Sequence, residues 1–276
     1  MIDYKIVDSN IIIENFNNFS LSQTLDCGQA FRWREIKQNL WEGIAFGKYL
    51  KISQNGTTFC FFNTTKEDFE NIWVPYFDIE RDYAKIITNI AAGGVLKDAA
   101  NYGNGIRIMR QDAWEALCSF IISQNNNIPR IKGIIERLCE NFGEKYDFGY
   151  TFPTPQKIAT LSLEDLSVLR SGFRAKYILD AAKQVSSGAV DLTQISSMPT
   201  DKARAELTKI YGVGEKVADC TLLYGMGHIN AFPKDVWIKR AVPYFFGEDF
   251  DERSLDNAGI IQQYMFFYAR ETKLQI

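Results

Sequence analysis

The hydrophobic pattern divides the chain into a strand-rich first part and a helical remainder. Up to about residue 62, short runs of β-branched and aromatic residues alternate with Asn, Gly and Gln clusters, which are typical of hairpin turns. Residues 65–91 then change to helical spacing. The runs predict six strands of an antiparallel sheet, at 4–7, 11–14, 31–35, 40–46, 49–53 and 57–62.

From about residue 110 the apolar positions follow the 3.6-residue period of α-helices, and Pro or Gly residues separate the periodic segments. Asp112 and Pro129 are residue types that begin helices. The pattern predicts helices at 112–123, 129–142, 163–170, 174–187, 200–210, 215–226, 235–246 and 256–270. The predicted fold class is α+β, with a twisted antiparallel β-sheet and flanking helices in residues 1–105 and an all-helical domain in 106–276.

Composition narrows the classes of protein that fit this pattern. The 276 residues carry a net charge of −3 and are 46% hydrophobic, an ordinary globular composition with room for about two domains. A single histidine, His228, leaves no His-rich metal site. The five cysteines are far apart with no CxxC pair, so we predict no structural zinc, no iron–sulfur cluster and free thiols in a reducing cytoplasm.

The chain has no segment typical of export or membrane insertion. Its N-terminal residues have acidic and amide side chains inside short apolar runs, unlike a secretory leader. No run approaches the roughly 18 apolar residues that a membrane span needs. We therefore expect a soluble, cytoplasmic protein with no membrane partner.

The most informative stretch covers residues 203–240, where two helical segments are joined by Tyr211-Gly212-Val213-Gly214. Two glycines around one β-branched residue predict a tight helix-hairpin-helix turn at about 203–226, with both glycines at positive φ. Backbone N–H groups at such a turn and at the following helix start form an anion site, for which a phosphodiester is the expected ligand. The alternative is a plain connection between two packed helices.

Two side chains in this stretch are candidates for chemistry. Lys216 lies in the first turn of the second helix, where the positive helix end disfavours a cation and favours the neutral amine of a nucleophile. Asp235 begins a later helix, so its carboxylate either caps that helix or acts near Lys216 if the helices pack together. A solvated surface lysine and a simple N-cap are the alternatives.

Four segments, in order along nearly the whole chain, resemble the 8-oxoguanine DNA glycosylase/AP lyase family of the helix-hairpin-helix, Gly/Pro-rich loop and Asp superfamily. They are LDCGQAFRW at 25–33, IRIMRQDAWEALCSFIISQNNNIPRI at 106–131, GVGEKVADC followed by PKDV, and AGIIQQYMFF at 258–267. The resemblance implies an enzyme that flips 8-oxoguanine out of duplex DNA and removes it through a lysine Schiff base. It also implies strand cleavage by β-elimination and an N-terminal domain that contributes to the lesion pocket.

The resemblance also assigns roles to single residues. It implies that Lys216 attacks the sugar C1′ and that Asp235 stabilises the developing positive charge and helps activate the lysine. The base would be held by the Gly28 backbone at N7, by Gln262 at its edge, and by Phe266 and Cys220 on its faces. Asn125 would fill the space left in the duplex, and Arg130 and Arg174 would contact the opposite base. The remaining implied DNA contacts are Gly212, Val213, Gly214 and Trp237.

Two positions depart from the family pattern, and two other functions stay open. The family usually has a tyrosine where this chain has Phe173, and a histidine where it has Trp237. We therefore expect weaker discrimination in favour of cytosine opposite the lesion. One alternative is a related helix-hairpin-helix glycosylase for another damaged base. The second is a non-catalytic DNA-binding module, which would need neither Lys216 nor Asp235.

The expected partner is double-stranded DNA containing 8-oxoguanine, bound by a monomer that is nucleoid-associated if the source is bacterial. No catalytic metal or other cofactor is implied, although a monovalent or calcium ion could bind hairpin carbonyls beside a DNA phosphate. Residues 201–240 contain seven Lys/Arg and five Asp/Glu, a local net charge of 7 − 5 = +2. The overall −3 is thus an average, compatible with modest, salt-sensitive DNA affinity.

Overall fold

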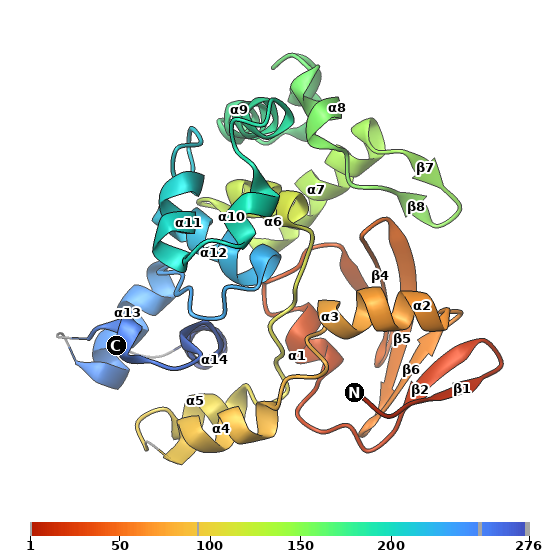
Figure 1. The fold of residues 1–276 in the computed structure, drawn as a ribbon, viewed down its shortest axis with the longest axis vertical. Helices are drawn as coiled ribbons and strands as arrows, with labels where there is room; N and C mark the ends of the chain where they lie inside the picture. The colour runs from red at the N-terminus through yellow and green to blue at the C-terminus, as the bar shows by residue number, and fades with distance from the viewer. Residues whose placement is uncertain (1, 93, 248–249, 274–276) are drawn as a thin grey trace.

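A six-stranded antiparallel sheet forms the first part of the molecule. The computed structural model describes residues 2–92, 94–247 and 250–273. The strand order is β1-β2-β6-β5-β4-β3, so that sequential hairpins build most of the sheet. Figure 1 shows this sheet on the right, with the helical part beside it. The strands are β1 (Lys5–Val7), β2 (Asn10–Ile13), β3 (Trp33–Lys37), β4 (Leu40–Ala45), β5 (Lys48–Asn55) and β6 (Thr58–Phe62).

Alternation of buried and exposed side chains gives the sheet one apolar face, as expected for an antiparallel sheet with a single covered side. Helices α2 (Lys66–Asp68) and α3 (Val74–Tyr76), joined by a π-helical turn at Phe69–Trp73, pack aromatic side chains onto that face. The Trp33 ring packs so closely on the backbone of Gly43 that only glycine fits there, because a Cβ would lie 2.4 Å from the ring.

The helical part is built around α6 (Ala113–Ser123), nine of whose eleven residues are buried. It contacts α7 (Ile128–Phe142), α9 (Arg174–Ser186) and α12 (Glu215–Met226). Figure 1 shows these helices grouped around it. The remaining helices are α1 (Leu21–Leu25), α4 (Tyr83–Ala92), α5 (Lys97–Tyr102), α8 (Pro155–Ala159), α10 (Leu192–Ser196), α11 (Thr200–Leu207), α13 (Val236–Phe246) and α14 (Ala258–Thr272).

The α+β fold class is confirmed, and the differences concern short elements. The predicted helix at 163–170 is a 3₁₀ turn at Asp165–Leu169, and the predicted helix at 65–91 is interrupted. Five-residue helices such as α1, α8 and α10, and the small hairpin β7 (Lys145–Tyr146) and β8 (Gly149–Tyr150), are too short to leave a periodic signal.

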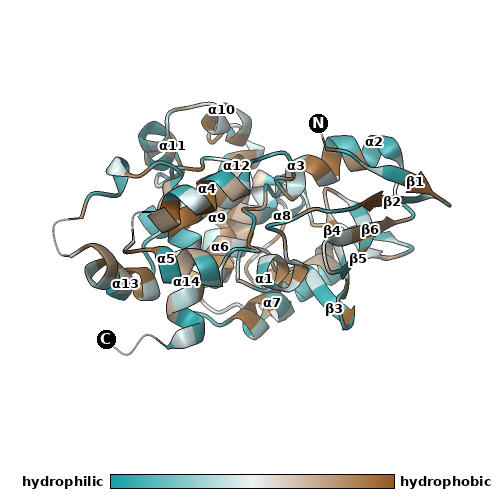
Figure 2. Ribbon diagram, turned by 90° about the horizontal axis from the view of Figure 1, so that it is seen from below, coloured by the Kyte–Doolittle hydropathy of each residue, from teal (hydrophilic) through white to brown (hydrophobic). Residues whose placement is uncertain are grey.

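Two hydrophobic cores underlie the two parts of the molecule. Helices α4 and α5 precede the predicted domain boundary at 105/106, yet their buried side chains belong to the core of the helical part. Met109 follows that boundary and packs in the core of the sheet. Figures 1 and 2 both show α1 between the sheet and α14, where the two parts meet. The boundary itself stays a prediction.

Candidate active site

Lys216 lies in the first turn of α12, and its amine reaches the C-terminal end of α6. Its Nζ donates a hydrogen bond to Ser123 Oγ at 3.2 Å and lies 5.5 Å from the centroid of the Phe120 ring. The side chain is half-buried. The alternative of a fully solvated surface lysine is therefore wrong, because the amine is held by a specific partner between two helices.

Asp235 is the N-cap of α13, as one of the two interpretations of its sequence position predicts. Its Oδ1 accepts hydrogen bonds from the backbone N–H groups of Trp237 at 3.0 Å and Ile238 at 2.8 Å. Its other oxygen, Oδ2, accepts no hydrogen bond within the described residues. Capping fixes the orientation of a half-buried carboxylate while leaving one oxygen open.

Cys220, one turn beyond Lys216 on α12, lies within electrostatic reach of both candidate groups. Burial raises the pKa of its thiol to about 11, the Lys216 ammonium acts to lower this pKa, and Asp235 acts to raise it. The amine, the thiol and the carboxylate therefore occupy one neighbourhood. Nothing in the sequence spacing of α12 and α13 establishes this proximity.

Tyr224, one further turn along α12, connects this neighbourhood to the loop that contains Gly28. Burial raises the pKa of Tyr224 well above its usual value, and the nearby Cys220 and Cys27 act in the same direction. Its ring stacks on Phe120 with the centroids 5.3 Å apart. The phenol is therefore enclosed between α6 and α14, where Gln262 and Gln263 accept hydrogen bonds from its Oη.

Gly28 lies close to Phe266 of α14. A Cβ on Gly28 would lie 3.4 Å from Ile128 Cδ1, 3.6 Å from Arg270 Nη1 and 4.0 Å from Phe266 Cε1. Gly28 has a φ of +91°, which favours glycine. The loop after α1, the start of α7 and α14 thus converge on one half-open wall, with Phe266 itself half-buried.

Gln262 is buried in α14, so the alternative of an exposed helix position is wrong. Its Nε2 donates to the backbone carbonyl of Pro233 at 3.1 Å. Among the described residues, the one hydrogen bond that its Oε1 accepts is long, at 3.5 Å, and comes from Tyr224 Oη. The side chain thus ties α14 to the segment just before Asp235, and its oxygen is the less engaged of its two polar atoms.

The side chains of the three asparagines that follow α6 differ in their hydrogen bonds. Asn126 Nδ2 donates to the Ile122 carbonyl at 3.0 Å, and Asn127 Oδ1 accepts from Arg130 N at 3.0 Å as the N-cap of α7. Asn125 is exposed, has a φ of +47°, and its side chain makes no hydrogen bond within the described residues. The turn therefore presents one free amide on a backbone that its neighbours hold.

Arg174 is a buried cation with no carboxylate partner among the residues that the structure describes. Its guanidinium donates to the backbone carbonyls of Gln124 and Asn125, and Nη1 donates to the Ser171 carbonyl at 3.1 Å. Burial and the neighbouring Arg130 lower the pKa of Arg174. Two guanidinium groups without an anion next to an exposed turn are electrostatically suited to a phosphodiester.

The hairpin between α11 and α12 has one glycine at positive φ, whereas two were predicted. Gly212 has a φ of +83°, and a Cβ there would lie 2.3 Å from the Tyr177 ring. For Gly214 the prediction is wrong, because this N-cap residue has a φ of −92° and a ψ of 177°. Apart from the residues next to it in the chain, no described residue has an atom within 4 Å of a Cβ built on Gly214, so no packing contact among them requires a glycine there. Val213 between them is buried.

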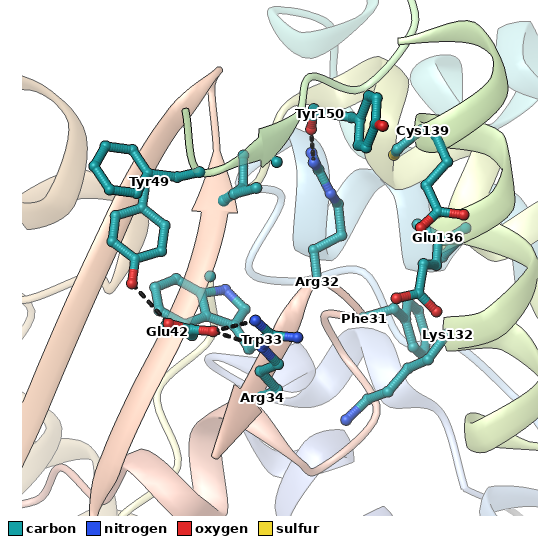
Figure 3. Close-up of a pocket in the computed structure, with 16 residues that line it drawn as sticks. Phe31, Arg32, Trp33, Arg34, Glu42, Tyr49, Lys132, Glu136, Cys139 and Tyr150 are labelled. Carbon is teal, nitrogen blue, oxygen red and sulfur yellow. Dashed lines mark hydrogen bonds and ion pairs between the residues drawn. The ribbon is translucent and has the colours of Figure 1, made fainter. Parts of the chain in front are cut away.

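A separate cavity of about 410 Å³ lies between the sheet and α7. Figure 3 shows Glu42 and Tyr49 on its sheet side and Glu136 and Cys139 on its α7 side. None of the predicted site residues lines it. Arg32 closes one end through its ion pair with Glu115 at 3.2 Å, which fixes the loop after Gly28 against α6.

Sequence reasoning missed Ser123, Tyr224 and Arg270. Each acts through a contact between distant segments, and the only available signal was proximity in sequence to a segment already singled out.

Within the described residues, no group of three or more His, Cys, Asp or Glu side chains could hold a metal ion. Nor does that part of the chain contain a helix long and apolar enough to cross a membrane.

Comparisons with known proteins identify the family. The family model of the 8-oxoguanine DNA glycosylase N-terminal domain matches residues 11–117, and that of the HhH-GPD superfamily base excision DNA repair protein matches 118–256. A protein of Methanothermobacter thermautotrophicus described as a probable N-glycosylase/DNA lyase is 32% identical over 245 residues, covering 76% of this chain and 77% of its own.

Two solved structures match over nearly their whole length. The complex of MBOgg1 with a low-affinity DNA ligand has a TM-score of 0.93 and 39% identity, covering 99% of each chain. The Clostridium acetobutylicum 8-oxoguanine glycosylase/lyase, in complex with double-stranded DNA containing cytosine opposite 8-oxoG, has a TM-score of 0.93 and 37% identity at the same coverage. Fold and site define a base-excision DNA repair protein of the HhH-GPD superfamily. Within it, the chain belongs to the 8-oxoguanine DNA glycosylase/AP lyase family.

Proposed function

We propose that this protein is a bifunctional DNA glycosylase/AP lyase that removes 8-oxoguanine from duplex DNA and then cleaves the strand. The observation that carries the proposal is the neighbourhood of three groups from two helices: the amine of Lys216, the thiol of Cys220 and the carboxylate of Asp235. The family and the named activities of the relatives support it.

Base capture requires that the damaged nucleotide leave the helical stack, which costs a few kcal/mol. The flipped base then lies between Cys220 and Phe266, and the free amide of Asn125 occupies the vacated space. The Gly28 carbonyl, which accepts no hydrogen bond within the described residues, accepts one from the N7–H group that 8-oxoguanine has and guanine lacks. Gln262 contributes its weakly engaged Oε1 to the base edge.

Base removal follows from an amine nucleophile. Once it has lost its extra proton, the Lys216 amine forms a bond to C1′ and the glycosidic bond breaks. The base leaves with the electron pair of that bond and takes up the proton that the alkylated nitrogen gives off. The open oxygen of Asp235 stabilises positive charge that develops on the sugar. Ring opening gives an imine between Nζ and C1′. Loss of a C2′ proton then expels the 3′ phosphate, which breaks the strand.

DNA binding uses the hairpin and the paired guanidinium groups. Because nothing in the protein occupies the space beside Gly214, a phosphate can approach its backbone and the start of α12. Arg130 and Arg174 face the opposite strand, where Phe173 provides a ring without a hydroxyl. The half-buried Trp237, beside Asp235, completes the proposed contacts. This arrangement supports relaxed preference for the base opposite the lesion.

The amine chemistry needs no metal or organic cofactor, and a cation at the hairpin carbonyls would affect DNA affinity alone. We therefore expect excision to continue in EDTA. The proposed acting form is a monomer, in the cytoplasm or with the nucleoid of a bacterial cell.

The proposal is tested on duplexes that carry one damaged base each. A duplex containing 8-oxoguanine should release the free base and give a cleaved strand, whereas duplexes with 3-methyladenine or hypoxanthine should stay intact. Preferred release of another base would favour the related glycosylase, and tight binding without release of any base would favour a binding module.

A further inference from the structure

Arg270, on the last turn of α14, bridges the two sides of the proposed lesion pocket. Its Nη1 donates to the Cys27 carbonyl at 3.3 Å, and its Nη2 lies 3.5 Å from the Asp26 carbonyl. Its guanidinium carbon lies 5.4 Å from the Phe266 ring centroid. The same group is the polar neighbour closest to the space beside Gly28, at 3.6 Å. One side chain therefore contacts both the loop and the aromatic wall.

The segment on the other side of Gly28 is already held firmly. Gln29 Nε2 donates to the carbonyls of Thr24 at 3.0 Å and Arg107 at 2.8 Å, and its Oε1 accepts from Met109 N. Its own carbonyl accepts from Gln111 Nε2 at 2.7 Å. Within the described residues, the Cys27 carbonyl before Gly28 accepts a hydrogen bond from Arg270 alone, whereas four hydrogen bonds hold Gln29 after it.

We propose that Arg270 is a positioning residue that fixes the Cys27–Gly28 peptide against Phe266 and thereby sets selectivity for 8-oxoguanine over guanine. The proposal rests on the proposed role of Gly28. The two bases differ at N7 by one N–H, so discrimination depends on an acceptor held at hydrogen-bond distance. The Gly28 carbonyl belongs to the peptide on the Gln29 side, and it is joined to the Cys27–Gly28 peptide through the φ of Gly28, +91°, which glycine itself restrains little. Without the bridge, the Cys27 side no longer fixes this angle, so the direction of the Gly28 carbonyl relative to Phe266 is held from the Gln29 side alone.

The remaining contacts of Arg270 do not account for this placement. Its Nε donates to Glu271 Oε1 at 2.9 Å, but that carboxylate is 40% exposed, and such pairs contribute little to stability. The Arg270 side chain is only 21% exposed, and its guanidinium lies over the Phe266 ring. Lys132, which pairs with Asp26 at 3.0 Å, holds the start of the loop and not the Gly28 peptide.

The enzyme offers an internal control, because an abasic site presents the sugar to Lys216 without a base to recognise. Single-turnover rates on 8-oxoguanine, guanine and abasic duplexes should be compared for wild type, Arg270→Ala and Arg270→Lys. The matched control is Arg34→Ala, an arginine with 76% exposed side chain that also pairs with a glutamate, far from α14.

Arg270→Ala should lower 8-oxoguanine excision at least tenfold and reduce its ratio over guanine, with abasic cleavage within threefold of wild type. Arg270→Lys, which keeps one donor for Cys27 without the planar fork, should fall in between, and it decides the question if the alanine variant does not fold. Unchanged selectivity, or equal loss on 8-oxoguanine and abasic duplexes, would overturn the proposal. If wild type acts on neither substrate, the proposed function fails instead.

Discussion

The Arg174 guanidinium donates a hydrogen bond from Nη2 to the backbone carbonyl of Asn125 at 2.8 Å. A buried cation thus holds in place the exposed residue that is proposed to fill the gap in the duplex. The same guanidinium donates to the backbone carbonyls of Gln124 and Ser171. Arg174 therefore has a structural role in addition to its proposed contact with the opposite base.

Replacement of Arg174 by alanine should cost stability as well as activity. It leaves the carbonyls of Gln124, Asn125 and Ser171 without their donor, and unpaired buried acceptors cost about 1–3 kcal/mol each. We expect the free energy of unfolding in urea to fall by about 2–4 kcal/mol after partial rehydration of the turn. Arg253→Ala, at a position with 79% exposed side chain, is the control and should change it little. Equal stabilities of the two variants would contradict the structural role.

The two hairpin glycines should respond differently to the same substitution. Gly212→Ala places a Cβ against the Tyr177 ring at a φ of +83° and should lower the free energy of unfolding by about 1–3 kcal/mol. Gly214→Ala meets no protein atom, so the fold should stay intact while DNA affinity drops at least tenfold. Thermal unfolding and binding titrations separate the effects. Gly214→Ala with unchanged affinity would argue against a phosphate beside this residue.

Phe173 is expected to relax the choice of opposite base. Its ring is 47% exposed, and the Arg174 guanidinium lies 4.5 Å from its centroid, so the position borders the proposed contact with the opposite strand. We predict comparable excision of 8-oxoguanine opposite cytosine and opposite the other bases, and a sharper cytosine preference in Phe173→Tyr. Rates on four duplexes measure this. A wild type that acts only opposite cytosine would rule it out.

The reactivity of the cysteine thiols should decrease as their burial increases. Burial raises the pKa of Cys220 to about 11 and that of Cys27 to about 12, so both stay protonated and unreactive at pH 8. The raised values favour the folded state below the unfolded pKa of about 9, and this contribution is lost as pH rises from 9 to about 11 or 12. Alkylation at pH 8, followed by peptide mapping, should label the partly exposed Cys60 first. Rapid labelling of Cys220 would contradict this.

The elements of this fold that could be predicted from the sequence are those whose hydrophobic pattern extends over several residues. The six strands and the longer helices were predictable because alternation and the 3.6-residue period persist over several residues. The aspartates that begin α6 and α13 were recognisable as local patterns, and the structure confirms capping by Asp112 and Asp235.

Other features depend on contacts that no local pattern encodes. The prediction of a positive φ at Gly214 was wrong because the second glycine caps α12 in an extended conformation. The turn then needs only one left-handed residue. Gln262 lies against the Pro233 carbonyl, and Lys216 lies against Ser123 across 93 residues of sequence. Such pairings arise from helix packing, so the candidate residues were predictable while their partners were not.

The central claim is that the Lys216 amine forms a covalent bond with the sugar. Borohydride added during reaction with an 8-oxoguanine duplex reduces an imine to a stable protein–DNA adduct. We predict an adduct with wild type that maps by mass spectrometry to Lys216, and none with Lys216→Gln. Lys209→Gln, another lysine of the hairpin region with 61% exposed side chain, should trap like wild type. Base release without any adduct, or full excision and trapping by Lys216→Gln, would contradict the account.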